Sequence, residues 1–241
     1  DPGPSEPVTM TSVFNAAAGL AGAASAPVAG IAQTLDLPRG SLALTAGYRA
    51  TPYMLISGAL RLDRRDAAEG APVLLALPGD LIGVEGLQGR SALSSARAIV
   101  ASVLAPLPQM SESAWCDLLM RSLVTQQERA AEVAELRCGS AAERIRKLLL
   151  LLSSQSRGGA GVSPWRNSSP SCEQPTLADM AVLTDTSIET ISRVISAMRR
   201  SGDLVRDNGR RVRLDPRVLS SDWALSASAT YSPRVRQAAA A

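Results

Sequence analysis

The sequence predicts an α+β protein made of a β-roll or jelly roll, one long helix and a winged helix-turn-helix unit, in that order. Two changes of pattern support this prediction. Short apolar runs broken by glycine fill residues 42–107, and a helical period then begins at Ser111. Two short helical segments and a hairpin complete the compact part of the chain. A chain of 241 residues is long enough for two modest domains with their own cores.

Composition restricts the classes of protein to which the chain can belong. The chain is 46% hydrophobic but only 3% aromatic, so its core must consist mainly of aliphatic side chains. It has no histidine, which excludes His-ligated zinc, His-ligated haem and His-based catalytic triads. Its three cysteines, Cys116, Cys138 and Cys172, are too few for a disulfide framework or for the four ligands of an iron–sulfur cluster. We expect no metal and no resident cofactor; a redox role for a thiol and an unidentified small-molecule effector stay open.

We expect neither a membrane span nor a secretion signal. No apolar run approaches the roughly 18 residues needed to cross a bilayer, and the candidate Leu148–Leu152 is far too short. The sequence begins at Asp1 without a basic segment, so we expect no secretory signal. The expectation is a soluble cytoplasmic protein without membrane contact.

Composition also divides the chain into five segments. Residues 1–34 are rich in Pro, Ala, Gly and Ser, and are expected to form a disordered tail. The β-roll is assigned to residues 35–110, the long helix to 111–138 and the winged helix-turn-helix unit to 139–222. A flexible tail is expected at residues 223–241.

The β character is clearest in the middle of the first unit. In the segment Gly58–Arg64, leucines alternate with charged residues, which is typical of a half-buried strand. Residues 66–71 are expected to form a turn, and the mostly apolar segment Pro72–Asp80 a second strand. Short strands at this spacing predict a small antiparallel barrel or jelly roll.

The long helix carries a seam of residues spaced alternately by four and three. These residues are Leu119, Leu123, Gln126, Ala130, Val133 and Arg137. The pattern resembles a coiled coil and favours pairing with a second copy of the chain, although an antiparallel contact within the same domain would give a similar pattern. A second helix is expected at Ser140–Ser153, after a break at Cys138 and Gly139, and the breaker-rich segment Ser153–Pro175 is expected to be a loop.

Two helices and a hairpin are expected in the last unit. The helices are placed at Leu177–Leu183 and Ser187–Ser201, with a tight turn at residues 184–186. Gly202 stands where a glycine commonly ends a helix. The segment Leu204–Leu214 is expected to form a hairpin closed by a two-residue Asn-Gly turn.

The second of these helices is amphipathic. Its predicted inward stripe is Ile188, Ile191, Ile195 and Met198, and its predicted outward face is Glu189, Ser192, Arg193, Ser196 and Arg200. Thr186 and Glu189 also have the spacing of a helix capping box. Glu189 therefore has two interpretations, as part of a helix cap and as a side chain aimed at something outside the protein.

The outward face has the chemistry of a DNA reader. Arginine can donate two hydrogen bonds to guanine, a carboxylate can accept one from cytosine N4, and serine can bind a base or a phosphate. Between Glu189 and Arg217 there are eight arginines and four acidic residues, a local charge of +4 against +3 for the whole chain. The expected base readers are Glu189, Ser192 and Arg193. The expected backbone contacts are Thr176, Ser187, Thr190, Ser196, Arg200, Arg210 and Arg211.

The same residues resemble a known family. TLADMAVLTDTSIETISRVISAMRRSGDL resembles the recognition segment of the Crp/Fnr superfamily of bacterial transcription regulators, and ETISR is close to its Fnr branch. YMLISGALRLDRRDAAEGAPVLLALPGDLIGVEGL resembles the cyclic-nucleotide-binding-like β-roll of that superfamily, and AAERIRKLLLLLSS its helix after the hinge. The usual turn glycine of the recognition segment is replaced by Asp185, which tolerates a left-handed backbone, and a usual apolar position by Thr184.

The resemblance implies a transcription regulator that binds double-stranded DNA as a homodimer and contacts RNA polymerase. It implies one recognition helix per half-site, with Glu189, Ser192 and Arg193 reading a TTGAT-like sequence. It also implies a dimer interface along the long helix, at Leu119, Leu123, Gln126, Ala130 and Val133. Whether such a regulator is an activator or a repressor stays open.

The candidate effector site has two interpretations. Members that bind cyclic nucleotides hold the ribose with a Glu and the phosphate with an Arg-Ser pair, and Gly83, Glu85, Arg90 and Ser91 follow in this order here. The connecting stretch is shorter than in the family, and Val84 stands where the Glu is expected, so a degenerate sensor is the competing interpretation. The competing function is a cyclic-nucleotide-binding module whose C-terminal unit mediates protein contacts. An enzyme is not expected, because no nucleophile–base pair or phosphate-binding glycine loop is present.

Overall fold

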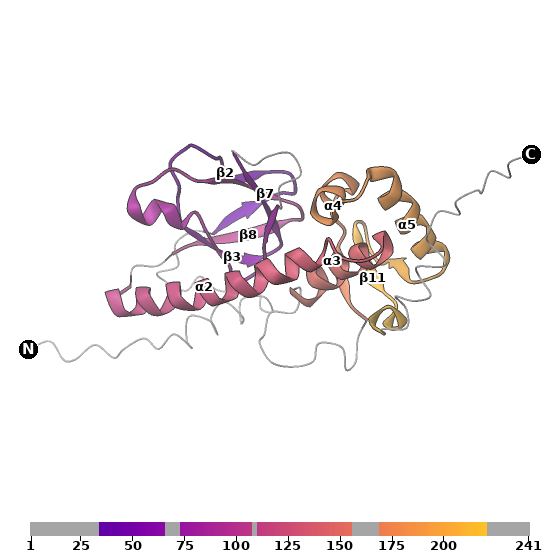
Figure 1. Ribbon diagram of the computed structural model, residues 1–241. Coiled ribbons are helices and arrows are strands. Elements are labelled where there is room, and N and C mark those ends of the chain that lie inside the picture. The colour runs from indigo at the N-terminus through magenta and orange to yellow at the C-terminus, as the bar shows by residue number, and fades with distance from the viewer. Residues whose placement is uncertain (1–33, 66–72, 108–109, 156–168, 221–241) are drawn as a thin grey trace, which may run out of the picture.

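The structure is a computed structural model that describes residues 34–65, 73–107, 110–155 and 169–220. Apart from Thr34, the tails predicted at 1–34 and 223–241 lie outside these residues, as does the turn predicted at 66–71. Figure 1 shows two lobes, with the N-terminal strands in one and the winged unit in the other. Helix α2 (Glu112–Glu135) runs along the first lobe towards the second.

The first lobe is a β-roll, as predicted. Its strands within the described residues are β1 (Leu35–Leu37), β2 (Leu42–Leu44), β3 (Tyr53–Ser57), β4 (Leu60–Arg64), β5 (Leu74–Ala76), β6 (Leu81–Ile82), β7 (Ser94–Ala98) and β8 (Ser102–Pro106). They form two antiparallel sheets, in the orders β1-β8-β3-β6 and β2-β7-β4-β5. Aliphatic residues from both sheets, among them Leu55, Leu60 and Leu104, share one core because each strand contributes apolar side chains to it.

The strand predicted at Gly58–Arg64 begins later, at Leu60, because Gly58 belongs to the turn between β3 and β4. Gly58 has a φ of 93°, which favours glycine. A Cβ atom at this position would lie 2.2 Å from Ser102 Oγ and 2.5 Å from the Ala101 carbonyl oxygen. The turns β3–β4 and β7–β8 are therefore packed against each other at one end of the β-roll.

The long helix and the helix after it agree closely with the prediction. Helix α2 begins after Ser111, whose side chain accepts a hydrogen bond from Ala114 N. The predicted break is confirmed at Gly139, which has a φ of 96°. Helix α3 (Ala141–Gln155) then starts with a capping box, in which Glu143 Oε2 accepts from Ser140 N at 2.7 Å.

The winged unit contains α4 (Leu177–Thr184), α5 (Ile188–Arg200) and a three-stranded sheet in the order β10-β11-β9. Its strands are β9 (Ser171–Glu173), β10 (Leu204–Arg206) and β11 (Arg211–Leu214), and the 3-10 helix η2 (Pro216–Leu219) follows. The loop predicted at Ser153–Pro175 was wrong where β9 forms. Cys172 in this strand is 1% exposed and opposite Val212, so burial of two apolar side chains outweighed the local turn signals.

The two-residue turn predicted for the hairpin was also wrong. Leu204 pairs with Leu214 and Arg206 with Val212, which leaves a three-residue turn centred on Gly209. A two-residue turn would place the buried Leu204 opposite the exposed Arg213, so core packing sets the register. In the described residues, Asp185 is the only non-glycine residue with a positive φ, so Asn208 does not adopt the backbone of a type I′ turn.

The two lobes share a hydrophobic core. One cluster of buried residues includes Ala59 and Ile99 of the β-roll, Leu136 after α2, Ile145 of α3 and Met180 of α4. The winged unit is therefore fixed to one end of the β-roll by apolar packing. No helix in the described ranges is long and apolar enough to span a bilayer.

Candidate nucleic-acid interface

Helix α5 separates a buried face from an exposed face. Ile191, Val194, Ile195 and Met198 are at most 2% exposed. The predicted outward residues Glu189, Ser192, Arg193, Ser196 and Arg200 are all exposed. Because neighbours on a helix recur every three to four residues, this exposed set forms a polar stripe that begins in the first turn of the helix.

Ile188 differs from the prediction that it points inward. Its side chain is 48% exposed, and Val194 takes the fourth place in the buried stripe. The buried residues are centred between Ile191 and Met198, so Ile188 lies at the edge of the stripe, in the first turn. Ile188 is therefore an exposed apolar side chain that adjoins the polar stripe one turn before Ser192.

The capping box predicted at Thr186 and Glu189 was wrong by one residue. Ser187 is the N-cap of α5, and its Oγ accepts a hydrogen bond from Thr190 N at 3.2 Å. The Thr186 hydroxyl instead donates to the Thr184 carbonyl oxygen. The Glu189 carboxylate has no hydrogen-bond partner among the described residues, so this side chain is exposed and available.

The turn before α5 holds the two predicted departures from the family pattern. Asp185 adopts φ 49° and ψ 56°, which is the left-handed conformation expected for it. Thr184 is fully buried, and its hydroxyl donates to the Met180 carbonyl oxygen at 2.7 Å. Both substitutions are therefore accommodated without an unpaired polar group at Thr184.

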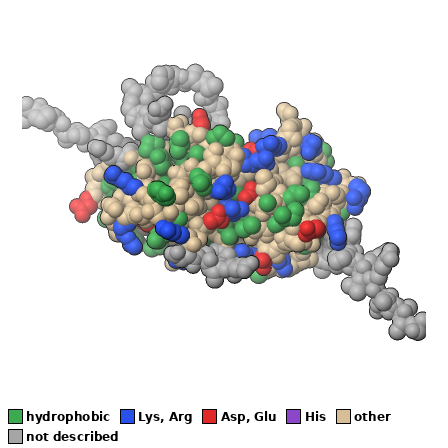
Figure 2. All heavy atoms as spheres, turned by 90° about the horizontal axis from the view of Figure 1, so that it is seen from above, with side chains coloured by type: hydrophobic (Ala, Val, Ile, Leu, Met, Phe, Trp, Pro, Cys, Tyr) green, Lys and Arg blue, Asp and Glu red, His purple; other side chains and the backbone are tan. Residues whose placement is uncertain are grey.

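The hairpin adds exposed positive charge beside α5. Arg206, Arg210, Arg211 and Arg213 are all exposed on it. Two other arginines of this segment already bind protein groups: Arg199 donates to the uncharged Gln174 side chain, and Arg217 forms an ion pair with Asp215 at 2.9 Å. The Arg217 backbone N–H and side chain also lower the pKa of Asp215. Figure 2 shows the basic side chains that face the viewer at this end of the molecule.

Thr176 has a different environment from the other predicted backbone contacts. It is the N-cap of α4, and its hydroxyl donates to Asp179 Oδ2 at 2.6 Å while it accepts from Asp179 N at 3.0 Å. A phosphate contact would therefore compete with the helix cap. Ser187 and Thr190 also bond to each other, at 3.0 Å between their oxygens, but Ser187 is exposed.

The candidate effector residues lie around the short 3-10 helix η1 (Val84–Gln88). Gly83 has a φ of 67°, and a Cβ there would lie 2.4 Å from the Thr51 carbonyl oxygen. Glu85 Oε1 accepts from Leu93 N at 3.3 Å, whereas Arg90 and Ser91 are exposed. Gly83 thus allows a close approach to the segment before β3, and Glu85 stabilises the backbone that follows η1.

A cavity of about 320 Å³ lies elsewhere, between the β-roll and α2, and the four candidate effector residues do not line it. Its lining includes Leu62, Leu81, Leu123, Gln126 and Arg129. Asp80 also lines the cavity and is 4% exposed. Burial raises the pKa of its carboxyl group. The hydrogen bond from Leu77 N and the Arg129 guanidinium, 3.4 Å away, oppose this increase but do not cancel it.

Helix α2 exposes several residues of the predicted seam, of which Leu123 and Gln126 also border the cavity next to the β-roll. Leu119 and Leu123 are 39% and 52% exposed, and Gln126 and Ala130 are exposed as well. Val133 differs from these seam positions, because it is 4% exposed and packs in the core shared by the two lobes. The exposed apolar part of the predicted seam therefore lies in the first half of the helix.

The cysteines show no sign of a shared site. Cys116 and Cys138 are exposed, and Cys172 is buried, which raises its pKa to about 12. In the part of the chain that the structure describes, no group of three His, Cys, Asp or Glu side chains could hold a metal ion.

Comparison with known proteins supports the fold. No protein-family model and no curated protein sequence matches the chain. A CRP-family transcriptional regulator from Thermus thermophilus aligns with a TM-score of 0.59 and 23% identity, over 82% of this chain and 96% of its own. A CRP/FNR-family regulator from the same organism gives 0.55 and 21%, over 83% and 100%. FixK2 from Bradyrhizobium japonicum gives 0.56 and 17%, over 84% and 98%. The chain thus has the fold of CRP/FNR regulators, as predicted.

Proposed function

We propose that this protein is a sequence-specific DNA-binding transcription regulator that acts as a homodimer on a two-fold symmetric operator. The observation that carries the proposal is the exposed stripe of Glu189, Ser192 and Arg193 in the first half of α5. Helix α5 follows the turn of the helix-turn-helix unit in the sequence. The N-terminal part of the second helix in such a unit is the part that enters the major groove.

Each of these side chains has a matching base. The Arg193 guanidinium presents the paired donors that fit O6 and N7 of guanine, and the Glu189 carboxylate accepts from the N4 amino group of cytosine. Ser192 can donate to or accept from a base edge. Ile188 adds an apolar group that suits the 5-methyl group of thymine. This set is compatible with a TTGAT-like half-site.

Backbone binding is assigned to the groups around this stripe. Arg210 and Arg211 on the hairpin and Arg200 on α5 are exposed cations that can bind phosphates without reading sequence. Ser187 and Thr190 can bind the same backbone from the N-terminus of α5, where the helix dipole favours an anion. Thr176 is the weakest member of this set, because its hydroxyl already serves the α4 cap.

Dimer formation is assigned to the apolar face of α2. Exposed Leu119, Met120, Leu123 and Val124 lie within about one and a half turns, which is a larger apolar surface than a solvated helix usually carries. A parallel pair of α2 helices would place two α5 helices on one side of the dimer. Two-fold symmetry of the protein then requires two-fold symmetry of the operator.

The remaining assignments concern partners and cofactors. We assign RNA polymerase as the protein partner at the operator, the cytoplasm as the location, and no resident cofactor. The β-roll is assigned a sensor role, in which any effector must bind two states of the protein with different affinity to change DNA binding.

The test is selection of binding sites from random DNA by the purified protein, followed by binding measured with fluorescence anisotropy. We expect a selected site with two inverted half-sites and one dimer bound per site, with the mass of the complex measured by light scattering. Leu123→Glu should produce monomers that bind the full site much more weakly. If selection enriches no sequence, or if the protein binds random DNA as tightly as any selected site, the proposed function is wrong.

A further inference from the structure

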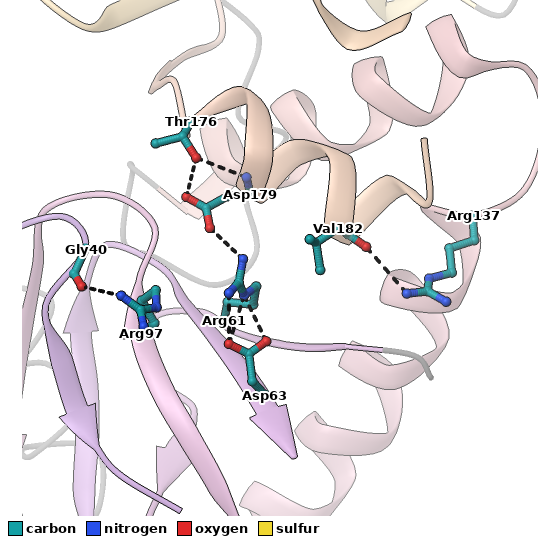
Figure 3. Close-up of polar contacts among 8 residues, drawn as sticks. All are labelled: Gly40, Arg61, Asp63, Arg97, Arg137, Thr176, Asp179 and Val182. Carbon is teal, nitrogen blue, oxygen red and sulfur yellow. Dashed lines mark hydrogen bonds and ion pairs between the residues drawn. The ribbon is translucent and has the colours of Figure 1, made fainter. Parts of the chain in front are cut away.

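The β-roll and the winged unit are joined by a polar contact as well as by their shared core. Arg61 on β4 donates from Nη1 to Oδ1 of Asp179 on α4 at 2.7 Å. The two residues are 118 positions apart in the sequence, and their side chains are 16% and 12% exposed. Figure 3 shows the Arg61 side chain reaching from the β-roll to the first turn of α4.

Both ends of this ion pair are held in place by further bonds. The Nε and Nη2 atoms of Arg61 donate to Asp63 on the same strand, at 2.9 to 3.1 Å. On the other side, the second carboxylate oxygen of Asp179 accepts from the Thr176 hydroxyl at 2.6 Å. A pair whose two members are each fixed by neighbours loses little conformational entropy when it forms, so it can define one relative orientation of the elements it joins.

A second polar contact joins the same two lobes at another point. Ala101 N, in the turn between β7 and β8, donates to Glu173 Oε2 at 3.1 Å, and Glu173 belongs to β9 of the winged unit. This turn packs against Gly58, which precedes β4, the strand that carries Arg61. One end of the β-roll therefore contacts the winged unit at both α4 and β9.

Helix α4 in turn positions α5. The Arg144 guanidinium on α3 donates to the Thr184 and Asp185 carbonyl oxygens at 3.2 and 3.0 Å, and to the Gly139 carbonyl oxygen at 2.8 Å. It thus ties the helix-turn-helix turn to the break after α2. Arg137 reaches the Val182 carbonyl oxygen of α4, also shown in Figure 3. Because Met180 and Leu183 of α4 pack in the same buried cluster as Ile191 of α5, a rotation of α4 would move α5 with it.

We propose that Arg61 and Asp179 are positioning residues that fix the angle of α5 relative to the β-roll and α2, and thereby the separation of the two recognition helices in the dimer. The inference rests on the proposed function and goes beyond it, because neither residue belongs to the exposed stripe of α5. The joined state leaves that stripe uncovered, so the pair orients the reading face without blocking it. Without the ion pair, the winged unit is held to the β-roll by the apolar core and the remaining polar contacts, so its angle varies more. The dimer then discriminates less strictly between operators with different half-site spacings.

The test uses the operator selected by the full-length protein and two variants of it, with one base pair inserted or removed between the half-sites. One base pair moves a half-site by about 3.4 Å along the duplex and turns it by about 34°. The measured quantity is the spacing ratio, the Kd for the altered operator divided by the Kd for the selected operator. A change in general stability alone would not alter this ratio.

We expect Arg61→Gln and Asp179→Asn each to lower the spacing ratio by about threefold or more. The ion pair is partly buried, so it contributes more than an exposed pair, and a dimer contains it twice. The double variant should lower it no further than either single variant, as required for two groups that act through one contact. Binding to a DNA fragment with a single half-site should stay within about twofold of the unchanged protein in all three variants.

Arg97→Gln is the matched control. Arg97 lies directly opposite Arg61 on β7 and carries the same charge, but it donates to the Gly40 carbonyl oxygen within the β-roll. Its loss should leave the spacing ratio unchanged. A second measurement needs no DNA: amide hydrogen exchange at Ala101 should speed up in Arg61→Gln and stay unchanged in Arg97→Gln.

Two results would overturn the inference alone. One is a spacing ratio in both Arg61→Gln and Asp179→Asn that equals that of the unchanged protein, with unchanged exchange at Ala101. The other is an equal drop in Arg97→Gln. If the unchanged protein selects no site with two half-sites, the proposed function and this inference fail together.

Discussion

The sharpest prediction concerns Arg193, which the proposal places against a guanine. The Arg193→Ala substitution removes an exposed side chain that has no ion pair among the described residues, so the free energy of unfolding should change by no more than about 0.5 kcal/mol. On DNA it removes two parallel hydrogen bonds to one base. Such a contact is worth about 1–3 kcal/mol, which is about 5-fold to 150-fold in Kd for each half-site.

The assay is fluorescence anisotropy with the selected operator, with operators in which each guanine is replaced singly, and with random DNA. We expect Arg193→Ala to lose affinity for the selected operator and to stop distinguishing guanine from its replacement at one position. Arg193→Lys is an informative companion, because it keeps the positive charge but cannot form the paired contact. It should retain binding to random DNA and still lose discrimination at the same guanine.

A matched comparison separates base reading from charge. Arg210 is another exposed arginine, but it lies on the hairpin, where the proposal gives it a phosphate contact. Arg210→Ala should weaken binding to every sequence alike. If Arg193→Ala instead behaves like Arg210→Ala, with equal losses on specific and random DNA, the assignment of Arg193 to base reading is refuted.

Three further predictions follow from the exposed groups and the buried thiol. Ile188→Ala should weaken binding to the selected operator by about threefold to fourfold. It should not weaken binding to an operator in which one thymine is replaced by deoxyuridine, because that base lacks the methyl group. Equal losses on both operators would contradict the contact. Arg210→Ala should reduce the slope of log Kd against log salt concentration by about one per half-site, and an unchanged slope would remove the hairpin from the DNA backbone. At pH 8, iodoacetamide should label Cys116 and Cys138 in the folded protein but Cys172 only after denaturation. The reason is that burial raises the pKa of Cys172 to about 12. Three labels on the folded protein, counted by mass spectrometry, would contradict this.

Local patterns predicted most of the elements well. The period of α2, the break at Gly139 and the amphipathic face of α5 all depend on residues close together in the sequence, and the structure contains each of them. The left-handed backbone at Asp185 was also predictable, since it depends on one residue and its turn. These features are the ones for which short-range geometry is sufficient.

The sequence-based predictions were wrong for a strand, a turn and a helix cap; for the strand and the turn, contacts between residues distant in the sequence determine the local structure. Strand β9 forms in a segment full of breakers because Cys172 is buried opposite Val212. The hairpin has three turn residues because the packing of Leu204 and Leu214 sets the register against the local preference of Asn-Gly. The capping interpretation of Glu189 was wrong because Ser187, one residue later than expected, caps α5.

The sequence by itself determined the order of the parts and the chemistry of the exposed α5 stripe. The polar face of an amphipathic helix can be identified from the sequence alone. It depends only on the spacing of polar and apolar residues along that one helix. Tertiary structure alone decided how that stripe is held. The contact between Arg61 and Asp179 joins residues 118 positions apart, and no local pattern links them. Only folding of the β-roll and the winged unit against a shared core brings these two charges within hydrogen-bond distance.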